Sequence, residues 1–506
     1  MQLGKEEARR ISEMTLSEKL GQMFVTGFPA EEMDESFRAL VKDKKVGNVI
    51  LFKDNLKNAE QIVGLSRDIR ALIYGETGEY PLITVDEEGG VVSRLPESMG
   101  KMPSAMALSA LHEPDEIYQA ARMSGKQLCA LGMNFNLAPV LDVNSNAANP
   151  VIGIRSYGRN PQDAWFYASQ AMRGYLDAGV MCSGKHFPGH GDVTSDSHLE
   201  LPVSAKSLDE LRQTELVPFE QAIRAHIPAV TIAHVVYSQL DDVPATMSRK
   251  IVTDLLRTEM GFDGLIISDC MEMNAISTTY GIEEGVIRAV LAGIELIFIS
   301  HKHDKVRSAM DALEQAVEQG RVPMEMIDAA VARILHYKRE YAQTEPIMDA
   351  EVFRACGSLA ENLFEKTIYA EKPFKLGGNP CFISPCQTQV SQVSNASGTL
   401  CFAREMQKHF GGSCVELPLK PDAQAAAEAV EAAKGASSVV VGTLNATVYK
   451  GQMDILEELE KLGVPMACVT FRNPFELDRL SDSVYKLTAW EYSKRSVERA
   501  EEFFTK

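Results

Sequence analysis

The sequence predicts an α/β protein that consists of a (β/α)8 TIM-type barrel followed by a smaller α/β domain. Eight short apolar runs separated by mostly helical segments predict the barrel. Ionisable residues at the ends of five runs support it, because barrel strands carry their functional groups there. A polar break after residue 340, followed by a second α/β pattern, predicts the smaller domain. The pattern alone also allows a doubly wound sheet, which alternates strands and helices in the same way.

The eight runs are apolar on both faces, as the strands of a buried parallel sheet are. In chain order they are 22–28, 47–52, 82–86, 136–143, 180–187, 229–234, 264–269 and 295–300. Helical segments lie between most of them, the clearest being 107–131, 163–176, 208–225 and 249–260. Eight strands with mostly helical connections are the number that closes such a barrel.

Ionisable residues end five of the predicted strands. They are Asp86, Asp142, the pair Lys185 and His186, His234 and Asp269. The carboxyl ends of barrel strands converge on one face, where catalysis takes place in this fold. We therefore expect these side chains to line one pocket.

The last helix of the barrel is predicted within 324–340, so the catalytic barrel covers residues 1–340. Residues 341–351 are polar and form a predicted linker, and residues 352–506 form the second domain. Its predicted strands are 381–384, 438–442, 466–470 and 484–488. Its predicted helices are 422–434 and 452–462.

The charge balance narrows the classes of partner. The chain has 506 residues, with 51 basic and 70 acidic side chains and a net charge of −19. Binding to nucleic acid or to an anionic membrane surface requires clustered basic residues. We therefore expect neither nucleic acid nor a membrane as a partner.

The sequence also predicts a cytoplasmic location. No apolar run is long enough to cross a membrane, which takes about 18 residues or more. Residues 1–7 lack the apolar core and small-residue cleavage site of a secretory signal. The nine cysteines are scattered without zinc-site spacing, so we expect reduced and mostly buried thiols.

The densest group of polar residues is the segment 185–198, K-H-F-P-G-H-G-D-V-T-S-D-S-H. Its proline and two glycines rule out a regular helix, so we expect a loop that leaves the fifth strand. Asp196 stands two residues before His198. In a loop this spacing lets the carboxylate accept a hydrogen bond from one ring nitrogen. The other nitrogen can then exchange a proton with a substrate near neutral pH.

Two further acids stand at strand ends. Asp269 directly follows an apolar run, where its carboxylate could act as a nucleophile, a base or a metal ligand, or could cap the next helix. Asp86 ends the third strand, where a carboxylate can bind two vicinal hydroxyls of a sugar. Donors for hydroxyls or for a carboxylate come from Arg94, Arg155, Lys185 and His186.

The pattern K-H-F-P-G-H-G-x-x-x-x-D-S-H resembles the signature of the β-N-acetylglucosaminidases of glycoside hydrolase family 3. Further segments resemble that family in the same order, namely 85–94, 136–143, 152–157, 233–234, 244–248 and 267–269. The likeness covers roughly residues 10–340. It extends more weakly to 439–444 and 469–477, which are similar to the family's second, α/β-sandwich domain.

The resemblance implies a retaining glycosidase without a cofactor or a metal. Asp269 would be the nucleophile that forms a covalent glycosyl–enzyme intermediate, and His198, oriented by Asp196, would be the acid and then the base. The positions that match the family's sugar-binding residues are Asp86, Arg94, Arg155, Lys185 and His186. The implied reaction releases terminal β-linked N-acetylglucosamine from a small carbohydrate or muropeptide. Peptidoglycan recycling in a bacterial cytoplasm fits this reaction.

The chain departs from the family pattern in three ways. Val91 follows the two glycines where Arg is usual, and Glu87 stands where Gln is common. We expect these two changes to affect the preference for sugar or aglycone, and not the reaction class. The C-terminal domain is also short. Because the loop with Asp196 and His198 supplies the acid–base group, we expect a structural or interaction role for that domain.

Three other functions stay open. A neutral histidine repels anions less than a carboxylate does, so the chain could be a β-N-acetylglucosaminide phosphorylase that uses phosphate in place of water. A metal-dependent barrel hydrolase could draw its ligands from His186, His190, Asp192, Asp196, His198 and Asp269. The non-enzymatic alternative is a barrel that senses sugars without catalysis.

Overall fold

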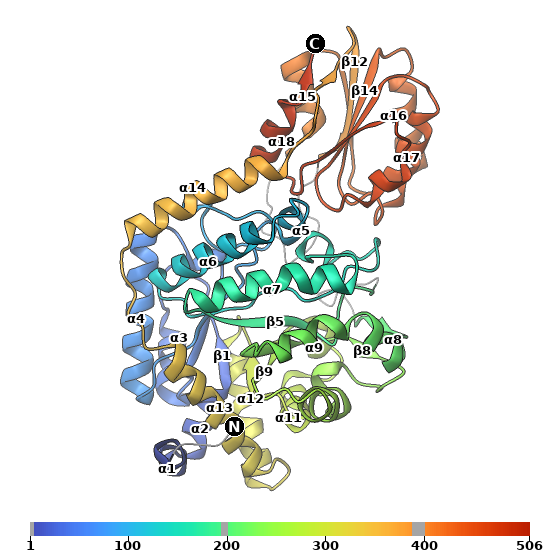
Figure 1. Cartoon of the computed structure of the whole chain (residues 1–506). Helices are drawn as coiled ribbons and strands as arrows, with labels where there is room; N and C mark the ends of the chain where they lie inside the picture. Colours follow the sequence, from blue (N-terminus) through green and yellow to red (C-terminus); the bar gives the residue numbers. More distant parts are fainter. Residues whose placement is uncertain (1–4, 194–200, 387–399) are drawn as a thin grey trace.

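Short apolar strands close into a parallel barrel in the N-terminal part of the chain (Figure 1). The computed structural model describes residues 5–193, 201–386 and 400–506. The barrel strands are β1 (Phe24–Thr26), β2 (Asn48–Leu51), β3 (Ile83–Val85), β4 (Phe135–Asn136), β5 (Met181–Phe187), β7 (Ala229–Ile232), β9 (Leu265–Cys270) and β10 (Leu296–Phe298). They pair in the order β1-β10-β9-β7-β5-β4-β3-β2. The predicted barrel is therefore confirmed, and the doubly wound alternative is wrong.

Helices cover the outside of the barrel, because each parallel connection has to cross back over the sheet. They are α2 (Leu16–Met23), α3 (Glu35–Lys44), α4 (Ala59–Thr77), α6 (Pro114–Leu131), α7 (Pro161–Asp177), α9 (Leu216–Arg224), α11 (Ile282–Ala292), α12 (His303–Glu318) and α13 (Met324–Tyr341). Their apolar faces pack against outward strand residues. Val49 and Leu51 of β2, for example, share a buried cluster with Ile62 and Ile69 of α4.

Some boundaries differ from the predicted ones for local reasons. Residues 22–23 were predicted as strand, but they end α2. That helix is fixed at its start by a capping box, in which the Thr15 side chain accepts from the Glu18 N–H and the Glu18 side chain accepts from the Thr15 N–H. The predicted helix 107–131 is two helices, α5 (Ala105–Ser109) and α6. Pro114 occupies the first turn of α6, where its missing N–H costs nothing.

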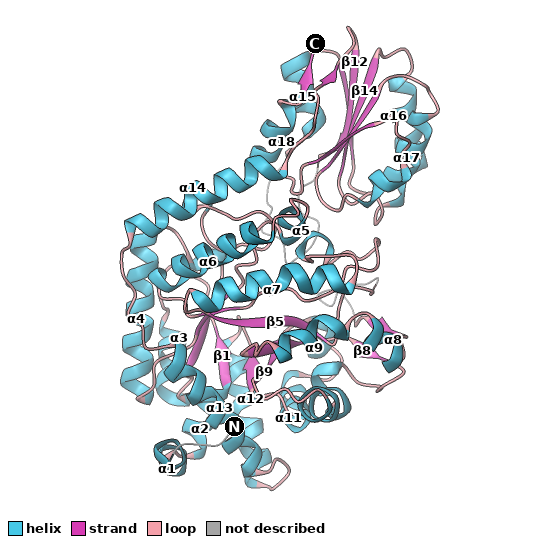
Figure 2. Cartoon of the chain, in the orientation of Figure 1, coloured by secondary structure: helices cyan, strands magenta, loops and turns pink. Residues whose placement is uncertain are grey.

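The C-terminal domain is a three-layer α/β unit. Its parallel sheet has the order β13-β12-β14-β15-β16. The strands are β12 (Pro380–Pro385), β13 (Ser413–Leu417), β14 (Ser438–Thr443), β15 (Met466–Thr470) and β16 (Tyr485–Thr488). Figure 2 shows one pair of helices on each face, α15 (Phe402–Phe410) and α18 (Lys494–Glu501) opposite α16 (Ala423–Ala433) and α17 (Lys450–Glu460). The predicted barrel followed by a smaller α/β domain is thus the observed architecture.

The two parts of the chain are joined by α14 (Ala350–Thr367), which runs from the barrel towards the C-terminal domain (Figure 1). Val91 and Val92 of the barrel share a buried apolar cluster with Phe471 and Trp490 of the C-terminal domain. The Thr447 hydroxyl donates to the Ala147 carbonyl at 2.7 Å. The C-terminal domain therefore packs on the loops at the carboxyl end of the barrel. Among the described helices, none combines the length and apolar character that crossing a membrane requires.

Candidate active site

The carboxyl ends of the barrel strands bring the predicted sugar-binding residues together. Asp86 directly follows β3, and its side chain contacts Lys185 of β5, with 2.8 Å between Lys185 Nζ and Asp86 Oδ1. Arg94 Nη2 lies 3.6 Å from Asp86 Oδ2. Arg155 joins Lys185 through Glu88, while His186, the next residue after Lys185, pairs with Asp142, whose charge acts on Arg155. All five predicted binding residues thus meet at the mouth of the barrel, whereas their roles in binding stay a prediction.

Glu88 holds the cations of this cluster in place. Arg155 donates to it twice, from Nε to Oε2 at 2.8 Å and from Nη2 to Oε1 at 2.7 Å. Lys185 Nζ lies 2.6 Å from the same Oε1. Sequence reasoning gave Glu88 no role. The signal that could have identified it is its place as the third acid in a row after the third strand, since Arg155 and Lys185 each require an acidic partner when buried.

Charge pairing outweighs burial for both acids. Burial alone raises the pKa of Asp86, but Lys185 and Arg94 hold that pKa below its ordinary value. Burial also raises the pKa of Glu88, and Arg155 and Lys185 bring it far below its ordinary value. Both carboxylates are therefore ionised at neutral pH. The Asp86 side chain is 19% exposed and that of Glu88 only 5%, so Asp86 is the acid that a ligand can reach.

The strand β5 carries two consecutive side chains into the site. Residues alternate between the faces of a regular strand, so neighbours normally point apart. Here the register with β7 shifts between Lys185 and Phe187, which leaves one extra residue in β5. Such a bulge re-aims side chains. Lys185 consequently reaches Asp86 while His186 Nδ1 lies 2.7 Å from Asp142 Oδ2.

Asp142 organises the start of the loop that follows β5. Besides pairing with His186, its Oδ1 accepts from the backbone N–H of His190 at 2.6 Å. Burial raises the pKa of Asp142, but His186 and these hydrogen bonds lower it overall. Burial also lowers the pKa of His190 to about 4, so that ring is neutral at neutral pH. Asp142 thus fixes both the ring of His186 and the path of the loop.

The predicted nucleophile lies near the end of β9. Asp269 is partly exposed, and its Oδ1 accepts from the Cys270 N–H at 2.7 Å. His234 follows β7, the neighbour of β9. Its Nδ1 lies 2.7 Å from Thr246 Oγ1, and its Nε2 lies 3.0 Å from the Cys270 carbonyl oxygen. The next helix, α10 (Asn274–Ser277), has Met273 as its cap residue. The alternative in which Asp269 caps that helix is therefore wrong.

The predicted acid–base residues, Asp196 and His198, lie outside the described residues. The described loop that leads towards them is held by two asparagines of the loop after β4. Asn149 Nδ2 donates to the His190 carbonyl at 2.8 Å, and Asn146 Nδ2 donates to the Asp192 carbonyl at 3.0 Å. Sequence reasoning missed both, because an asparagine in a loop has many structural uses.

The two positions that depart from the family pattern make backbone and apolar contacts beside the cluster of charges. Glu87 Oε2 accepts from the backbone N–H groups of Arg94 and Leu95, at 2.8 and 3.2 Å. Burial raises the pKa of this carboxyl. Val91 lies in the apolar cluster between the two domains. Glu87 therefore positions the backbone of Arg94, and Val91 contributes to domain packing.

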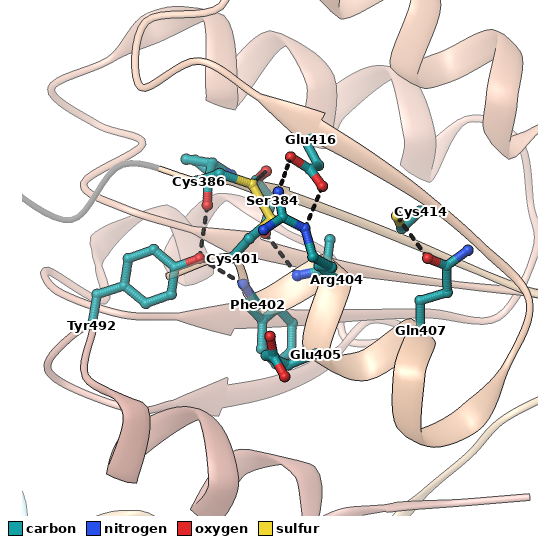
Figure 3. Close-up of a disulfide and its surroundings, with 12 residues drawn as sticks. Ser384, Cys386, Cys401, Phe402, Arg404, Glu405, Gln407, Cys414, Glu416 and Tyr492 are labelled. Atoms are coloured by element: carbon teal, nitrogen blue, oxygen red, sulfur yellow. Dashed lines mark hydrogen bonds and ion pairs between the residues drawn. A yellow bond between two sulfur atoms is a disulfide. The ribbon is translucent and has the colours of Figure 1, made fainter. Parts of the chain in front are cut away.

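A second cluster of ligand-type side chains lies in the C-terminal domain (Figure 3). In the described part of the chain, Cys386, Cys401 and Glu416 are the one group of three with ligand atoms within 4.8 Å of one another. The two sulfurs form a disulfide, and Arg404 donates twice to Glu416, at 2.7 and 2.5 Å. These pairings occupy the ligand atoms, so the cluster is not suited to a cation. The expectation of reduced thiols is wrong for this pair, which the fold brings together from the end of β12 and the start of α15.

Comparison with known proteins places the barrel in a family. Residues 15–337 match the glycosyl hydrolase family 3 N-terminal domain. Beta-hexosaminidase A from Pseudoalteromonas piscicida is 33% identical over 329 residues, which are 60% of this chain and 55% of that protein. A beta-hexosaminidase from Thiobacillus denitrificans is 36% identical over 286 residues, 55% of this chain and 78% of that protein.

A solved structure extends the likeness to the C-terminal domain. The glycoside hydrolase family 3 beta-N-acetylglucosaminidase from Paenibacillus sp. str. FPU-7 has a TM-score of 0.82 and 34% identity, and the match covers 96% of this chain and 95% of that chain. The barrel, the strand-end cluster and a family match over more than half of the sequence agree, and this chain belongs to glycosyl hydrolase family 3.

Proposed function

We propose that the protein is a retaining β-N-acetylhexosaminidase that releases terminal β-linked N-acetylglucosamine from amino-sugar oligosaccharides, including muropeptides. The observation that supports this most is the cluster of Asp86, Lys185, Glu88 and Arg155 at the carboxyl ends of the barrel strands. Asp269 lies near the carboxyl end of another barrel strand, β9. The related proteins named beta-hexosaminidase and the Paenibacillus beta-N-acetylglucosaminidase support the choice of sugar.

In this proposal the terminal sugar binds through its hydroxyls. The reachable carboxylate of Asp86 accepts hydrogen bonds from hydroxyls, and Arg94, Arg155, Lys185 and His186 donate to them. The buried pairs keep these groups charged and in fixed positions, so little reorganisation accompanies binding. Glu88 is a positioning residue, because it acts through Arg155 and Lys185.

The reaction then follows the two steps of a retaining glycosidase. Asp269 forms a bond to the anomeric carbon while the glycosidic bond breaks and His198 gives its proton to the leaving oxygen. His198 next takes a proton from water, whose oxygen displaces Asp269 and releases N-acetylglucosamine. Asp196 orients His198 in both steps.

The test is turnover of a chromogenic β-N-acetylglucosaminide, with product analysis. We expect Asp269→Ala to abolish turnover, because the covalent bond has no other acceptor in this proposal. We also expect that a fluorinated sugar that traps glycosyl–enzymes labels the wild type and does not label Asp269→Ala. Asp254→Ala, which changes an exposed acid on the outside of the barrel, is the matched control. Near wild-type activity in Asp269→Ala would remove the nucleophile assignment.

Two further arms of the same assay separate the alternatives. Added inorganic phosphate yields N-acetylglucosamine 1-phosphate if the enzyme is a phosphorylase, and free N-acetylglucosamine alone if it is a hydrolase. Exhaustive chelation leaves turnover unchanged if no metal takes part. Muropeptides assayed against plain amino-sugar disaccharides then test the proposed role in peptidoglycan recycling, for which we propose a cytoplasmic location.

A further inference from the structure

Two aromatic rings meet at the barrel mouth outside the cluster of charges. Phe52 directly follows β2 and keeps the inward phase of Ile50, which packs in the barrel core. His301 follows β10, the strand on the other side of β1. The centroids of the two rings lie 4.6 Å apart, with 37° between their planes. The rings thus bridge the ends of β2 and β10, the two neighbours of β1.

Hydrogen bonds hold the backbone at both ring-bearing residues. The Phe52 N–H donates to Asn55 Oδ1 at 2.8 Å, and Asn55 Nδ2 donates in turn to the Phe28 carbonyl at 2.8 Å. The His301 N–H donates to Glu272 Oε2 at 2.6 Å. The backbone positions from which the two rings project are therefore held without help from a ligand.

The pair lies between the two groups that the proposed reaction requires. Arg94, which pairs with Asp86, has its guanidinium carbon 5.9 Å from the centroid of the Phe52 ring. On the other side, Glu272 stands three residues after Asp269 in the chain. Around the barrel, β2, which precedes Phe52, and β10, which precedes His301, lie between β3, which precedes Asp86, and β9, which carries Asp269.

The pair is also accessible. Phe52 is half-buried and His301 is exposed, whereas most large aromatic side chains of the barrel are buried. Partial burial, together with Arg94 and Lys302, lowers the pKa of His301, so its ring is uncharged at neutral pH. Two neutral rings open to solvent beside charged, ligand-reachable groups are the composition of a small-molecule site with apolar and polar parts.

We propose that Phe52 and His301 form a stacking platform for the apolar C–H face of a pyranose ring of the substrate. A pyranose presents several axial C–H bonds on one face, and these contact the negative face of an aromatic ring favourably. The inference rests on the proposed glycosidase function and adds residues that favour a pyranose ring over an alcohol without such a C–H face. The ring that stacks is either the terminal sugar or the sugar of the leaving group, since both contain the same C–H face.

The test compares Phe52→Leu, which keeps apolar volume and removes the ring, with Phe52→Trp, which keeps an aromatic face. Substrates are an aryl β-N-acetylglucosaminide and a disaccharide of two β-linked N-acetylglucosamines. We expect Phe52→Leu to raise KM by about 3- to 10-fold with a smaller change in kcat, and Phe52→Trp to stay within about twofold of the wild type. His301→Ala should raise KM in the same direction. Phe166→Leu, on the outer face of α7 with 49% exposure, is the matched control.

The two substrates identify the stacked ring. A loss with both places the terminal sugar on the platform, and a loss with the disaccharide alone places the leaving-group sugar there. An unchanged KM in Phe52→Leu with both substrates overturns the proposal, as does an equal change in Phe166→Leu.

Calorimetric titration with free N-acetylglucosamine and with the disaccharide, on an Asp269→Asn background, measures the platform without turnover. Weaker binding of either sugar in Phe52→Leu supports the platform even if the wild type hydrolyses neither substrate, so that outcome would remove the glycosidase proposal alone. Equal binding by Phe52→Leu and its parent overturns the platform alone.

Discussion

At the scale of single residues, the candidate site depends on buried acidic and basic side chains that pair with one another beside one partly exposed carboxylate. Asp86 presents one reachable carboxylate, while Glu88, Arg155 and Lys185 are nearly inaccessible. Breaking a buried ion pair by removing one partner leaves an uncompensated charge, which is costly. The cluster should therefore matter for stability as well as for binding.

Replacing Glu88 by Gln tests this directly. We expect the free energy of unfolding to fall by about 3 kcal/mol or more, because Arg155 and Lys185 lose a shared buried partner. Activity should fall with it, since both cations lose their fixed positions. Denaturant titration with Glu325→Gln, an exposed acid on α13, as control measures the difference. A stability equal to that of the control would show that the cations find other partners.

The stability difference between the wild type and Glu88→Gln should also depend on pH. The pKa of Glu88 is far below its ordinary value of 4.5 in the folded protein, so its contribution to stability is present above that value. It is lost as the pH falls towards the folded-state pKa, because the unfolded chain takes up the proton first. The difference in unfolding free energy between wild type and Glu88→Gln should therefore be constant above about pH 5 and shrink at lower pH. A difference that grew on acidification would contradict the assignment.

At the scale of elements, the regular strands and helices could be predicted from the sequence, whereas features that depend on a single tertiary contact could not. Runs that are apolar on both faces indicated the eight strands, and polar residues at their ends indicated some of the side chains that meet, namely Asp86 with Lys185 and Asp142 with His186. The sequence did not indicate the bulge in β5 that lets Lys185 and His186 share a pocket, since register depends on the neighbouring strand. Nor did it reveal the role of Glu88, whose partners are Arg155 in the segment after β4 and Lys185 on β5.

A buried lysine between two elements of the barrel predicts a second pH effect. Lys338 of α13 donates to Gln22 Oε1 at 2.6 Å and to the Gly47 carbonyl at 2.9 Å, both neutral acceptors. Burial lowers its pKa from 10.5 to about 7. Between these values the unfolded chain binds the additional proton, so stability rises with pH, by up to about 1.4 kcal/mol per pH unit.

Lys338→Met should remove this slope, whereas Lys372→Met, which changes an exposed lysine, should keep it. Denaturant titrations at several pH values between 7 and 9 measure both slopes. Equal slopes in the two variants would mean that Lys338 keeps its proton throughout this range.

The loop after β4 predicts an effect on turnover. Asn149 Oδ1 accepts from the N–H groups of Val151 and Ile152, at 2.9 and 2.8 Å, while its Nδ2 holds the His190 carbonyl. Asn149→Ala should therefore lower kcat by about 10-fold, in line with the cost of losing the one hydrogen bond that holds the His190 carbonyl, and change KM less. Asn379→Ala, at an exposed position, is the control. A loss confined to KM would mean that the loop serves binding and not the chemical steps.

At the scale of the whole molecule, the C-terminal domain reaches the proposed acid–base loop through one intermediate. Thr447 holds the Ala147 carbonyl, and the adjacent Asn146 holds the Asp192 carbonyl. We expected a structural or interaction role for this domain, and the two contacts suggest the hypothesis that it also positions the loop. Coupling between the two contacts is what distinguishes these possibilities.

A double-mutant cycle measures that coupling. If the domain positions the loop through residues 146–147, the effects of Thr447→Val and Asn146→Ala on kcat should be non-additive by at least about 0.5 kcal/mol, because both variants loosen the same connection. Asp478→Asn supplies the matched control. Its carboxylate bridges the domains by pairing with Arg159 at 2.7 Å, but both side chains are more than half exposed. An exposed pair of this kind contributes little, so Asp478→Asn should combine additively with Asn146→Ala. Additivity in both cycles would mean that the C-terminal domain packs on the barrel without positioning the loop.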